Sequence, residues 1–472
     1  MNKTGIIYGV NGPVIYLKGD PGFKISEMVY VGPEKLVGEV IGLKKGMTTV
    51  QVFEETTGLK PGDTVMGTGD AISVLLGPGI IHNIFDGIQR PLEEIAKSSG
   101  KYISRGVSVD SLDTAKKWDV HVTVKVGDMV SAGTIIAETQ ETASILHKSM
   151  VPPTIGEAEV IKAVPDGAYT ILDPIVTVRL SDGSERDIAL AQKWPIRVPR
   201  PTYKRFPASV PLVTGQRILD TLFPIAKGGT AAIPGGFGTG KTMTQHQIAK
   251  WSDADIIIYI GCGERGNEMT QVLEEFSELI DPKSGNPLMD RTVLIANTSN
   301  MPVAAREASI YTGLTLAEYY RDMGYHVAIM ADSTSRWAEA LRELSGRLEE
   351  MPAEEGFPAY LASKLSAFYE RAGMMHNLNG SVGSVTIIGA VSPQGSDFSE
   401  PVTQNTKRFV RCFWGLDKSL AYARHFPAIH WLTSYSEYVQ DLAPWYNAKA
   451  GKDFIANRNR LMAILNQESA LM

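Results

Sequence analysis

The segment from Gly235 to Thr242 reads GGFGTGKT, and its residue types and spacing match the phosphate-binding pattern G-x-x-x-x-G-K-[ST] in full. Glycines let backbone N–H groups turn inward around phosphate oxygens, and a following helix directs its positive N-terminal end to the same point. Lys241 would add a mobile charge for the β- and γ-phosphates, and the Thr242 hydroxyl would be a ligand for Mg²⁺. Gly236 and Thr239 fall at variable positions of the pattern, so their identities are expected to matter little. The expected phosphate-loop residues are Gly235, Gly236, Phe237, Gly238, Thr239, Gly240, Lys241, Thr242 and Met243.

A phosphate loop of this kind needs a metal-supporting carboxylate at the end of another strand, and Asp332 fits that place. It follows the apolar run 326–331 and precedes the polar residues 333–335. We expect Asp332 to bind the metal ion itself or a water molecule coordinated to it. An alternative is that Asp332 caps the helix expected from Arg336, because aspartate is a favoured N-cap residue.

A second acidic position follows the strand expected at 255–260, in the segment GCGERGNE (261–268). Glu264 would lie at the carboxyl end of that strand, at the edge where open α/β sheets bind their ligands. A carboxylate there can orient and deprotonate an attacking water molecule, and Arg265 can contribute charge at the phosphates. The alternative is that Glu264 and Glu268 only provide the negative charge that is favourable at a helix N-terminus.

The same turn contains a pattern found in dinucleotide-binding proteins, because GCGERG satisfies G-x-G-x-x-G after a strand and before a helix. Two features argue against that use. The charged residues Glu264 and Arg265 occupy variable positions, and a complete phosphate loop already lies one strand earlier. Cys262 is expected to be a small buried residue, although its place near Glu264 leaves sensitivity to oxidation open. The eight histidines show no metal-ligand spacing.

The elements that must position these residues follow Pro211, where apolar strands alternate with amphipathic helices. This alternation predicts a parallel sheet covered by helices on both faces. The expected strands are 230–233, 255–260, 292–296 and 326–330, and the expected helices are 242–251, 267–279, 303–323 and 336–350.

The first 195 residues instead show short β segments between Gly-, Pro- and Asp-containing turns. Segments 5–10, 14–17, 36–43 and 47–53 predict a small barrel or sandwich, and 121–126, 130–138, 156–164 and 175–180 predict a second β-rich block. The proline-rich segment from Pro195 to Pro211 is expected to be a linker. Residues 453–472 are helical by pattern and stop without a glycine cap, so we expect the chain to end inside a helical domain. The expected domains are 1–75 (β-barrel), 76–115 (connector), 116–195 (β-rich insertion), 196–436 (nucleotide-binding α/β domain) and 437–472 (an incomplete helical domain).

Composition excludes several classes of protein. The formal net charge of −6 provides no global basic field for neutralising phosphates, so no nucleic-acid partner is expected. No stretch approaches the ~18 apolar residues of a membrane span, and the first 20 residues lack the apolar segment of a signal peptide. Two cysteines, Cys262 and Cys412, are too few for a disulfide framework, which favours a reducing, cytoplasmic setting.

Several longer strings are specific enough to compare with known families. They are PLVTGQRILD (211–220), LFP (222–224), GERGNE (263–268), DSTSRWAEALRE (332–343), PAEEGFPAYL (352–361), RHFPAIHWLTSYS (424–436), LGPG (76–79) and DGIQRPL (86–92). Together with the phosphate loop, they resemble the catalytic A subunits of V/A-type rotary ATPases over essentially the whole chain. Three differences within that superfamily agree with this resemblance. Non-catalytic B subunits lack a phosphate loop, F-type α subunits carry Gln where this chain has Glu264, and the block at about 116–188 is similar to the insertion that distinguishes the catalytic V/A-type subunits.

The resemblance implies a multidomain fold: an N-terminal β-barrel, a β-rich insertion, a central RecA-like α/β domain with the phosphate loop, and the start of a C-terminal helical domain. It implies that ATP or ADP binds with Mg²⁺ at Lys241 and Thr242, that Glu264 activates water and that Arg265 binds phosphate. It also places Phe426 against the adenine ring, with a buried core aromatic as the alternative.

The resemblance further implies that the chain alternates with B subunits in a hexameric ring, with an arginine of B completing each site. Central rotor and peripheral stalk subunits would connect the ring to a membrane sector that the chain contacts only indirectly, from the cytoplasmic face. ATP hydrolysis or synthesis would then be coupled to transport of H⁺ or Na⁺. The sequence determines neither the ion nor the direction.

One departure concerns the end of the chain. Family members continue into a complete helical domain that contacts the rotor, whereas this sequence stops near the first helices. Two other functions therefore stay open. One is another hexameric phosphate-loop motor, such as a type III secretion ATPase or a Rho-like helicase, and the other is a truncated subunit that binds nucleotide without turnover.

Overall fold

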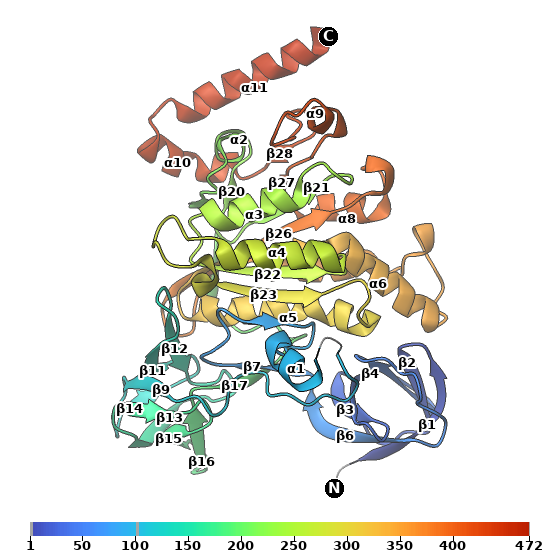
Figure 1. Cartoon of the computed structure of the whole chain (residues 1–472). Helices are drawn as coiled ribbons and strands as arrows, with labels where there is room; N and C mark the ends of the chain where they lie inside the picture. Colours follow the sequence, from blue (N-terminus) through green and yellow to red (C-terminus); the bar gives the residue numbers. More distant parts are fainter. Residues whose placement is uncertain (1–2, 101–102, 472) are drawn as a thin grey trace.

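A largely parallel β-sheet in the second half of the chain carries the residues singled out above (Figure 1). The structure, a computed structural model, describes residues 3–100 and 103–471, so Met1 and Met472, the ends of the two outermost expected domains, lie outside the described residues. Across the sheet the strands are β28 (Tyr435–Ser436), β27 (Cys412–Phe413), β21 (Thr230–Pro234), β26 (Val382–Val391), β24 (His326–Asp332), β22 (Ile256–Cys262), β23 (Thr292–Asn297) and β8 (Ile84–Phe85), with β25 (Gly373–His376) and β18 (Lys204–Phe206) joined to β26.

Strand β22 shows how the sequence specifies this sheet, because every residue of its segment IIIYIGC is buried. Neighbouring side chains pack on opposite faces. Ile258 lies in the apolar cluster that includes α5 (Val303–Asp322), and Tyr259 lies in the cluster that includes α3 (Lys241–Trp251) and α4 (Gly266–Glu278). An all-apolar strand is stable only where both faces are covered. The expected α/β architecture is therefore confirmed, with strand and helix ends within a few residues of the expectation.

The N-terminal block forms a closed six-stranded barrel. Around it the strands are β1 (Thr4–Asn11), β2 (Val14–Lys18), β5 (Met47–Val52), β4 (Leu36–Lys44), β3 (Glu27–Val31) and β6 (Thr64–Ala71). Alternate residues point inward, as the pairs Val29 with Val31 and Val50 with Val52 illustrate. The expected barrel is confirmed, although β3 and β6 had no clear signal in the sequence.

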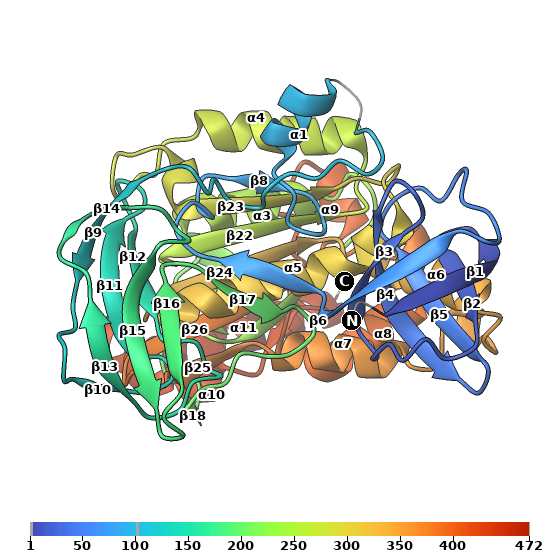
Figure 2. The ribbon, with the colours of Figure 1, turned by 90° about the horizontal axis from the view of Figure 1, so that it is seen from below.

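The second β-rich block forms two four-stranded sheets, which confirms the expected insertion. One sheet contains β10 (Met129–Val130), β13 (Ala158–Ala163), β15 (Pro174–Leu180) and β16 (Glu185–Ala189); the other contains β12 (Leu146–Met150), β11 (Ile135–Gln140), β9 (Trp118–Val122) and β14 (Gly167–Tyr169). Viewed from below, this insertion and the barrel flank the central sheet on opposite sides (Figure 2).

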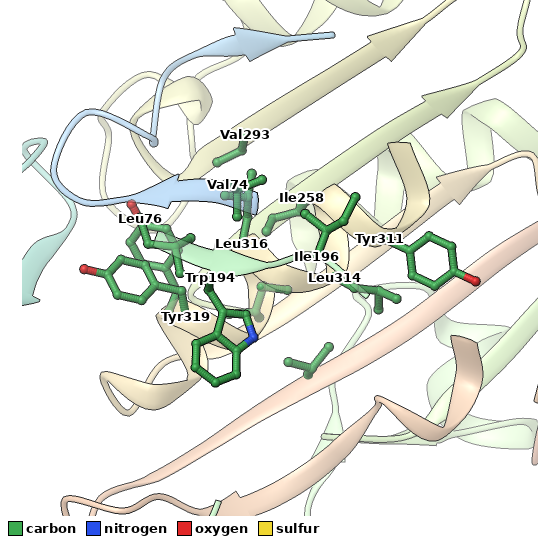
Figure 3. Packing of buried hydrophobic residues seen from close by; sticks show 14 of the residues in the cluster. Val74, Leu76, Trp194, Ile196, Ile258, Val293, Tyr311, Leu314, Leu316 and Tyr319 are labelled. Atoms are coloured by element: carbon green, nitrogen blue, oxygen red, sulfur yellow. The ribbon is translucent and has the colours of Figure 1, made fainter. Parts of the chain in front are cut away.

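A two-stranded ribbon of β7 (Ser73–Leu76) and β17 (Gln192–Pro195) lies against helix α5. Its side chains Val74 and Trp194 gather with Leu316 of α5, while Ile258 and Val293 approach from the sheet (Figure 3). Helix α5 is therefore covered on both sides, and its residues from Ala304 to Asp322 are all buried. The segment expected to be only a connector thus closes the core beneath the sheet.

The segment from Pro195 to Pro211 is not a free linker, which corrects the expectation. Arg197 forms ion pairs with Glu39 of the barrel at 2.6 Å and with Glu307 of α5 at 2.8 Å. Arg200 pairs with Asp322 at 2.7 Å, and residues 204–206 pair with β25. Proline-rich composition indicated irregular backbone correctly, but it carries no information about side chains that are anchored in a neighbouring domain.

The remaining elements are short or lie near the C-terminal side. They are α1 (Leu92–Ser99), β19 (Pro211–Leu212), α2 (Arg217–Leu222), β20 (Ile225–Ala226), α6 (Thr334–Arg347), α7 (Leu361–Glu370), α8 (Pro401–Phe409), α9 (Lys418–Tyr422), α10 (Val439–Lys449) and α11 (Phe454–Leu471). Helix α11 has no buried residue and extends away from the sheet (Figure 1). Among residues 3–100 and 103–471, no helix has the length and apolar character that crossing a membrane requires.

Candidate functional site

The candidate site lies at the edge of the sheet where the phosphate loop after β21 meets the carboxyl ends of β22, β24 and β26. A cavity of about 670 Å³ opens there. The predicted residues that line it are Gly236, Phe237, Gly238, Gly240, Lys241, Thr242, Met243, Glu264, Arg265 and Asp332. Three predicted residues, Gly235, Thr239 and Phe426, do not line the cavity. Residues from three separate stretches of the chain are thus brought together because parallel strands end at a common edge.

The phosphate loop has the backbone that its glycines permit. Gly238 and Gly240 have φ angles of 77° and 91°, which side chains rarely adopt, and Gly240 directly precedes helix α3. The Nζ atom of Lys241 donates hydrogen bonds to the carbonyls of Gly235 at 2.9 Å and Gly236 at 3.2 Å. Burial lowers the pKa of Lys241, while the carboxylates of Asp332 and Glu264 oppose this shift. The lysine is therefore held over the loop in a cavity with acidic walls.

One expectation about the loop was wrong, because Thr239 has a defined structural role. Its side chain is buried, and its hydroxyl donates to the Gly236 carbonyl at 2.8 Å. A Cβ at Gly235 would lie 2.4 Å from that hydroxyl oxygen, and a Cβ at Gly236 would lie 2.1 Å from Oγ of Ser396. The sequence pattern leaves positions 236 and 239 free, whereas the fold fills the space around both.

Asp332 ends strand β24 and is almost fully buried. Its Oδ2 atom accepts hydrogen bonds from the Thr242 hydroxyl and from the Tyr259 hydroxyl, both at 2.9 Å. Asp332 does not cap the following helix; the N-cap of α6 is Ser333, whose side chain accepts from the backbone N–H of Arg336 at 3.4 Å. The capping alternative is therefore wrong.

The pair of Thr242 and Asp332 fits a magnesium ion. A hydroxyl and a carboxylate oxygen are the hard ligands that Mg²⁺ prefers. Within the described part of the chain, no group of three or more His, Cys, Asp or Glu side chains could hold a metal by itself. Mg²⁺ usually takes only one or two protein ligands and completes its shell with water and substrate phosphates. The site therefore suits an ion that arrives with a nucleotide.

Glu264 sits on the turn after β22 and faces the same cavity. Burial raises the pKa of Glu264 to about 8, and the neighbouring carboxylates of Asp332 and Glu268 add to the shift, while Arg336 opposes it. The Arg265 side chain is 59% exposed, with its guanidinium 5.5 Å from the ring centre of Phe237 and 3.7 Å from Glu268. A half-buried carboxyl group with a raised pKa beside a phosphate loop has the properties of a general base.

Phe426 is 61% exposed, which excludes the alternative of a core aromatic. Its Cε1 atom lies 4.0 Å from the position that a Cβ would take at Gly240, so the ring is close to the phosphate loop although it does not line the cavity. Cys262 is buried as expected.

Sequence reasoning missed part of the lining. It includes Arg336, His246, Gln271, the loop 392–396, Lys418 and Tyr422. Loop 392–396 follows β26, a buried run that ends at the same edge as β22 and β24. The apolar residues 382–391 were therefore a usable signal for this loop.

A phosphate loop, a buried aspartate beside its threonine and a glutamate with a raised pKa on one sheet edge define a nucleotide-binding site of the phosphate-loop ATPase class. Residues 215–436 match the nucleotide-binding domain of the ATP synthase alpha/beta family. Residues 109–197 match its barrel-sandwich domain, and residues 7–69 match its β-barrel domain. The chain belongs to the ATP synthase alpha/beta family.

Similar proteins narrow the position within that family. The chain is 62% identical to the V-type ATP synthase alpha chain of Halothermothrix orenii over 472 residues, covering 100% of this chain and 80% of that protein. It is 63% identical to V-type ATP synthase alpha chain 2 of Clostridium tetani (99% of this chain, 79% of that one). It is also 58% identical to the corresponding catalytic-type chain, the A subunit of the A-type ATP synthase, of Methanopyrus kandleri (99% and 79%). These similarities include the insertion and set aside the secretion ATPase and the helicase.

Proposed function

We infer that this chain is the catalytic subunit of a V/A-type rotary ATPase, and that it hydrolyses or synthesises ATP in the cavity beside the phosphate loop. The observation that carries this inference is the convergence of Lys241, Glu264 and the pair Thr242–Asp332 on one cavity. The similarity to alpha chains of V-type ATP synthases and to their A-type counterparts over nearly the whole chain supports the same activity.

In this proposal each residue has a separate task. The Glu264 carboxylate accepts a proton from the water molecule whose oxygen attacks the γ-phosphorus, as the bond to the β–γ bridging oxygen breaks. Lys241 and Arg265 offset negative charge on the phosphate oxygens. Mg²⁺ held by Thr242 and Asp332 would supply further charge neutralisation at the β- and γ-phosphates. The acidic neighbours that raise the pKa of Glu264 make it a stronger base.

We further propose that the chain works in a ring that alternates with B subunits and connects to a central rotor and peripheral stalks, on the cytoplasmic face of a membrane. The exposed Arg265 and the open cavity are compatible with completion of the site by a neighbouring protein of the ring. An arginine supplied in trans is worth about 10³–10⁵ in rate in related phosphate-transfer enzymes. The chain alone should therefore hydrolyse ATP slowly. The coupled ion would be H⁺ or Na⁺.

The test is MgATP turnover of the chain mixed with its B-subunit partner, beside the variants Glu264→Gln and Glu274→Gln. Glu274 is an exposed carboxylate on α4 and serves as the matched control. We expect turnover only in the mixture, loss of turnover in Glu264→Gln with nucleotide binding retained, and normal turnover in Glu274→Gln. Nucleotide binding without turnover in any version would support the alternative of a nucleotide-holding protein. Full turnover in Glu264→Gln would reject the assigned base.

A further inference from the structure

The turn that carries Glu264 is held by the segment that follows strand β23. The N–H of Gly263 donates to the carbonyl of Asn297 at 2.7 Å, and the carbonyl of Glu264 accepts from the N–H of Ser299 at 2.9 Å. Gly263 has a φ of 74°, and a Cβ there would lie 2.9 Å from Cδ of Arg306. The backbone of the candidate base is therefore fixed from one side by residues 297–299.

Arg306, in the first turn of α5, lies directly behind that segment. Its Nη2 atom donates to the carbonyl of Ser299 at 2.8 Å, and its own carbonyl accepts a hydrogen bond from the Cys262 thiol at 3.5 Å. Ser299 is thus bonded to Glu264 through its N–H and to Arg306 through its carbonyl. Arg306 connects helix α5, the end of β22 and the turn after β23.

The environment of Arg306 is unusual for an arginine. The residue is only 8% exposed, and among the residues that the structure describes its Nε has no hydrogen-bond partner. Glu307, its neighbour on the helix, pairs with Arg197 instead. A buried guanidinium without a carboxylate partner is costly, and an apolar side chain would be more stable in such a place. The charge and the planar donors of Arg306 are therefore present for something other than stability.

We propose that Arg306 is a positioning residue for Glu264, which it holds at the attack position through Ser299. This inference rests on the proposed function of Glu264. Arg306 does not line the cavity, so it acts on the reaction only through the turn. A displacement of about 1 Å in a reacting group can lower a rate by about 100-fold. Removing the brace should therefore lower turnover strongly while nucleotide binding is kept.

The variants Arg306→Met and Arg306→Lys test the proposal in the ring assembled with B subunits. Thr312→Val is the matched control, because Thr312 is a buried residue of the same helix that donates one hydrogen bond to a backbone carbonyl, at Gly87. We expect Arg306→Met to lower kcat by about 30- to 100-fold, with the Kd for MgADP changed by less than about threefold. Arg306→Lys keeps the charge without the planar fork and should lose less, and Thr312→Val should stay near wild type.

Two further measurements separate positioning from general damage. In a Glu264→Gln background, Arg306→Met should cause no additional loss of turnover, because the residue acts only through Glu264. An equal fold-loss in both backgrounds would overturn the proposal. Hydrogen exchange on the isolated chain should be at least about tenfold faster at the amides of Gly263 and Ser299 in Arg306→Met than in Thr312→Val, and unchanged exchange would also overturn it. If Glu264→Gln itself keeps full turnover, the proposed function fails, while the exchange result still decides whether Arg306 braces the turn.

Discussion

The hydroxyl of Thr242 donates a hydrogen bond to Oδ2 of Asp332 at 2.9 Å, although 90 residues separate them in sequence. Thr242 lies in the first turn of α3 and Asp332 ends β24, with β26 between their strands in the sheet. The Tyr259 hydroxyl donates to the same oxygen, also at 2.9 Å. These contacts fix the orientation of the aspartate before any ligand binds.

Replacing Asp332 by Asn should weaken the response to Mg²⁺, because the amide removes the negative charge beside the Thr242 hydroxyl. We expect the free Mg²⁺ concentration for half-maximal turnover of the assembled ring to rise by about 10- to 100-fold. Tyr259→Phe is the control, since it removes one hydrogen bond to the same oxygen but keeps the carboxylate. An Mg²⁺ titration of turnover gives both values. Equal Mg²⁺ dependence in wild type and Asp332→Asn would contradict the metal assignment.

The pH dependence of turnover should report Glu264 and its acidic neighbour Glu268. A base must be deprotonated to act, so a raised pKa means that kcat/KM climbs with pH and levels off only above about pH 8. Glu268→Gln removes a like charge and a hydrogen bond that both raise the pKa of Glu264. The rising limb should therefore move to lower pH in Glu268→Gln. The exposed control Glu274→Gln should leave the profile of kcat/KM against pH in place, and a limb that stays fixed in Glu268→Gln would argue against coupling.

The sequence predicted most of the central fold because its buried strands have a strong pattern. Runs such as IIIYIGC can be stable only as interior strands, and the helices between them are long and periodic. Short edge strands could not be predicted in the same way. Ile84–Phe85 becomes a strand only because β23 lies beside it, and Tyr435–Ser436 only because of β27. The contact of Arg197 with both Glu39 and Glu307 likewise depends on domain packing that no local pattern encodes.

The candidate site divides along the same line. The phosphate loop is contiguous in sequence, and Glu264 and Asp332 each follow an apolar run, so their positions at the sheet edge could be predicted. Arg306 could not, because it lies inside a helix where its spacing carries no signal, and its contact with Ser299 exists only in the folded chain. Phe426 came from resemblance alone, and the fold places it beside the cavity.

Glu141, at the contact between the insertion and α5, should make stability depend on pH. Burial raises the pKa of Glu141 from 4.5 to about 7, although backbone N–H groups of Gly79 and Ile81 and the Tyr320 hydroxyl bond the carboxyl group. The protonated group therefore contributes stability that is complete below pH 4.5 and is lost as the pH rises through about 7. At one pKa unit per 1.4 kcal/mol, this loss is about 3 kcal/mol at most.

Glu141→Gln removes the titration and keeps an acceptor for the two N–H groups. The variant should consequently gain thermal stability relative to wild type between pH 5 and pH 8, because only wild type must ionise a buried group. Thermal unfolding midpoints at these two pH values provide the measurement. The control is Glu138→Gln, a partly exposed carboxylate on the same β-rich block. A difference between Glu141→Gln and wild type that does not change with pH would show that Glu141 ionises normally.

Phe426 should contribute to recognition of the nucleotide base. Its ring is 61% exposed and lies next to Gly240, beyond the end of the cavity where the phosphates would sit. Base stacking on an aromatic ring is worth about 1–3 kcal/mol by alanine substitution, so Phe426→Ala should weaken ATP binding by about 5- to 150-fold. Phe426→Tyr keeps a stacking surface and should bind ATP nearly as well as wild type.

Inorganic triphosphate distinguishes a stacking role from damage to the phosphate loop, because it has no base. Its affinity, measured by calorimetry on the chain with Mg²⁺, should be the same in wild type and Phe426→Ala. Tyr422→Ala is a useful comparison, since Tyr422 lines the cavity and is 76% exposed. If Tyr422→Ala weakens ATP but not triphosphate, while Phe426→Ala changes neither, the base contacts Tyr422 and the role assigned to Phe426 through family resemblance belongs to its neighbour on α9.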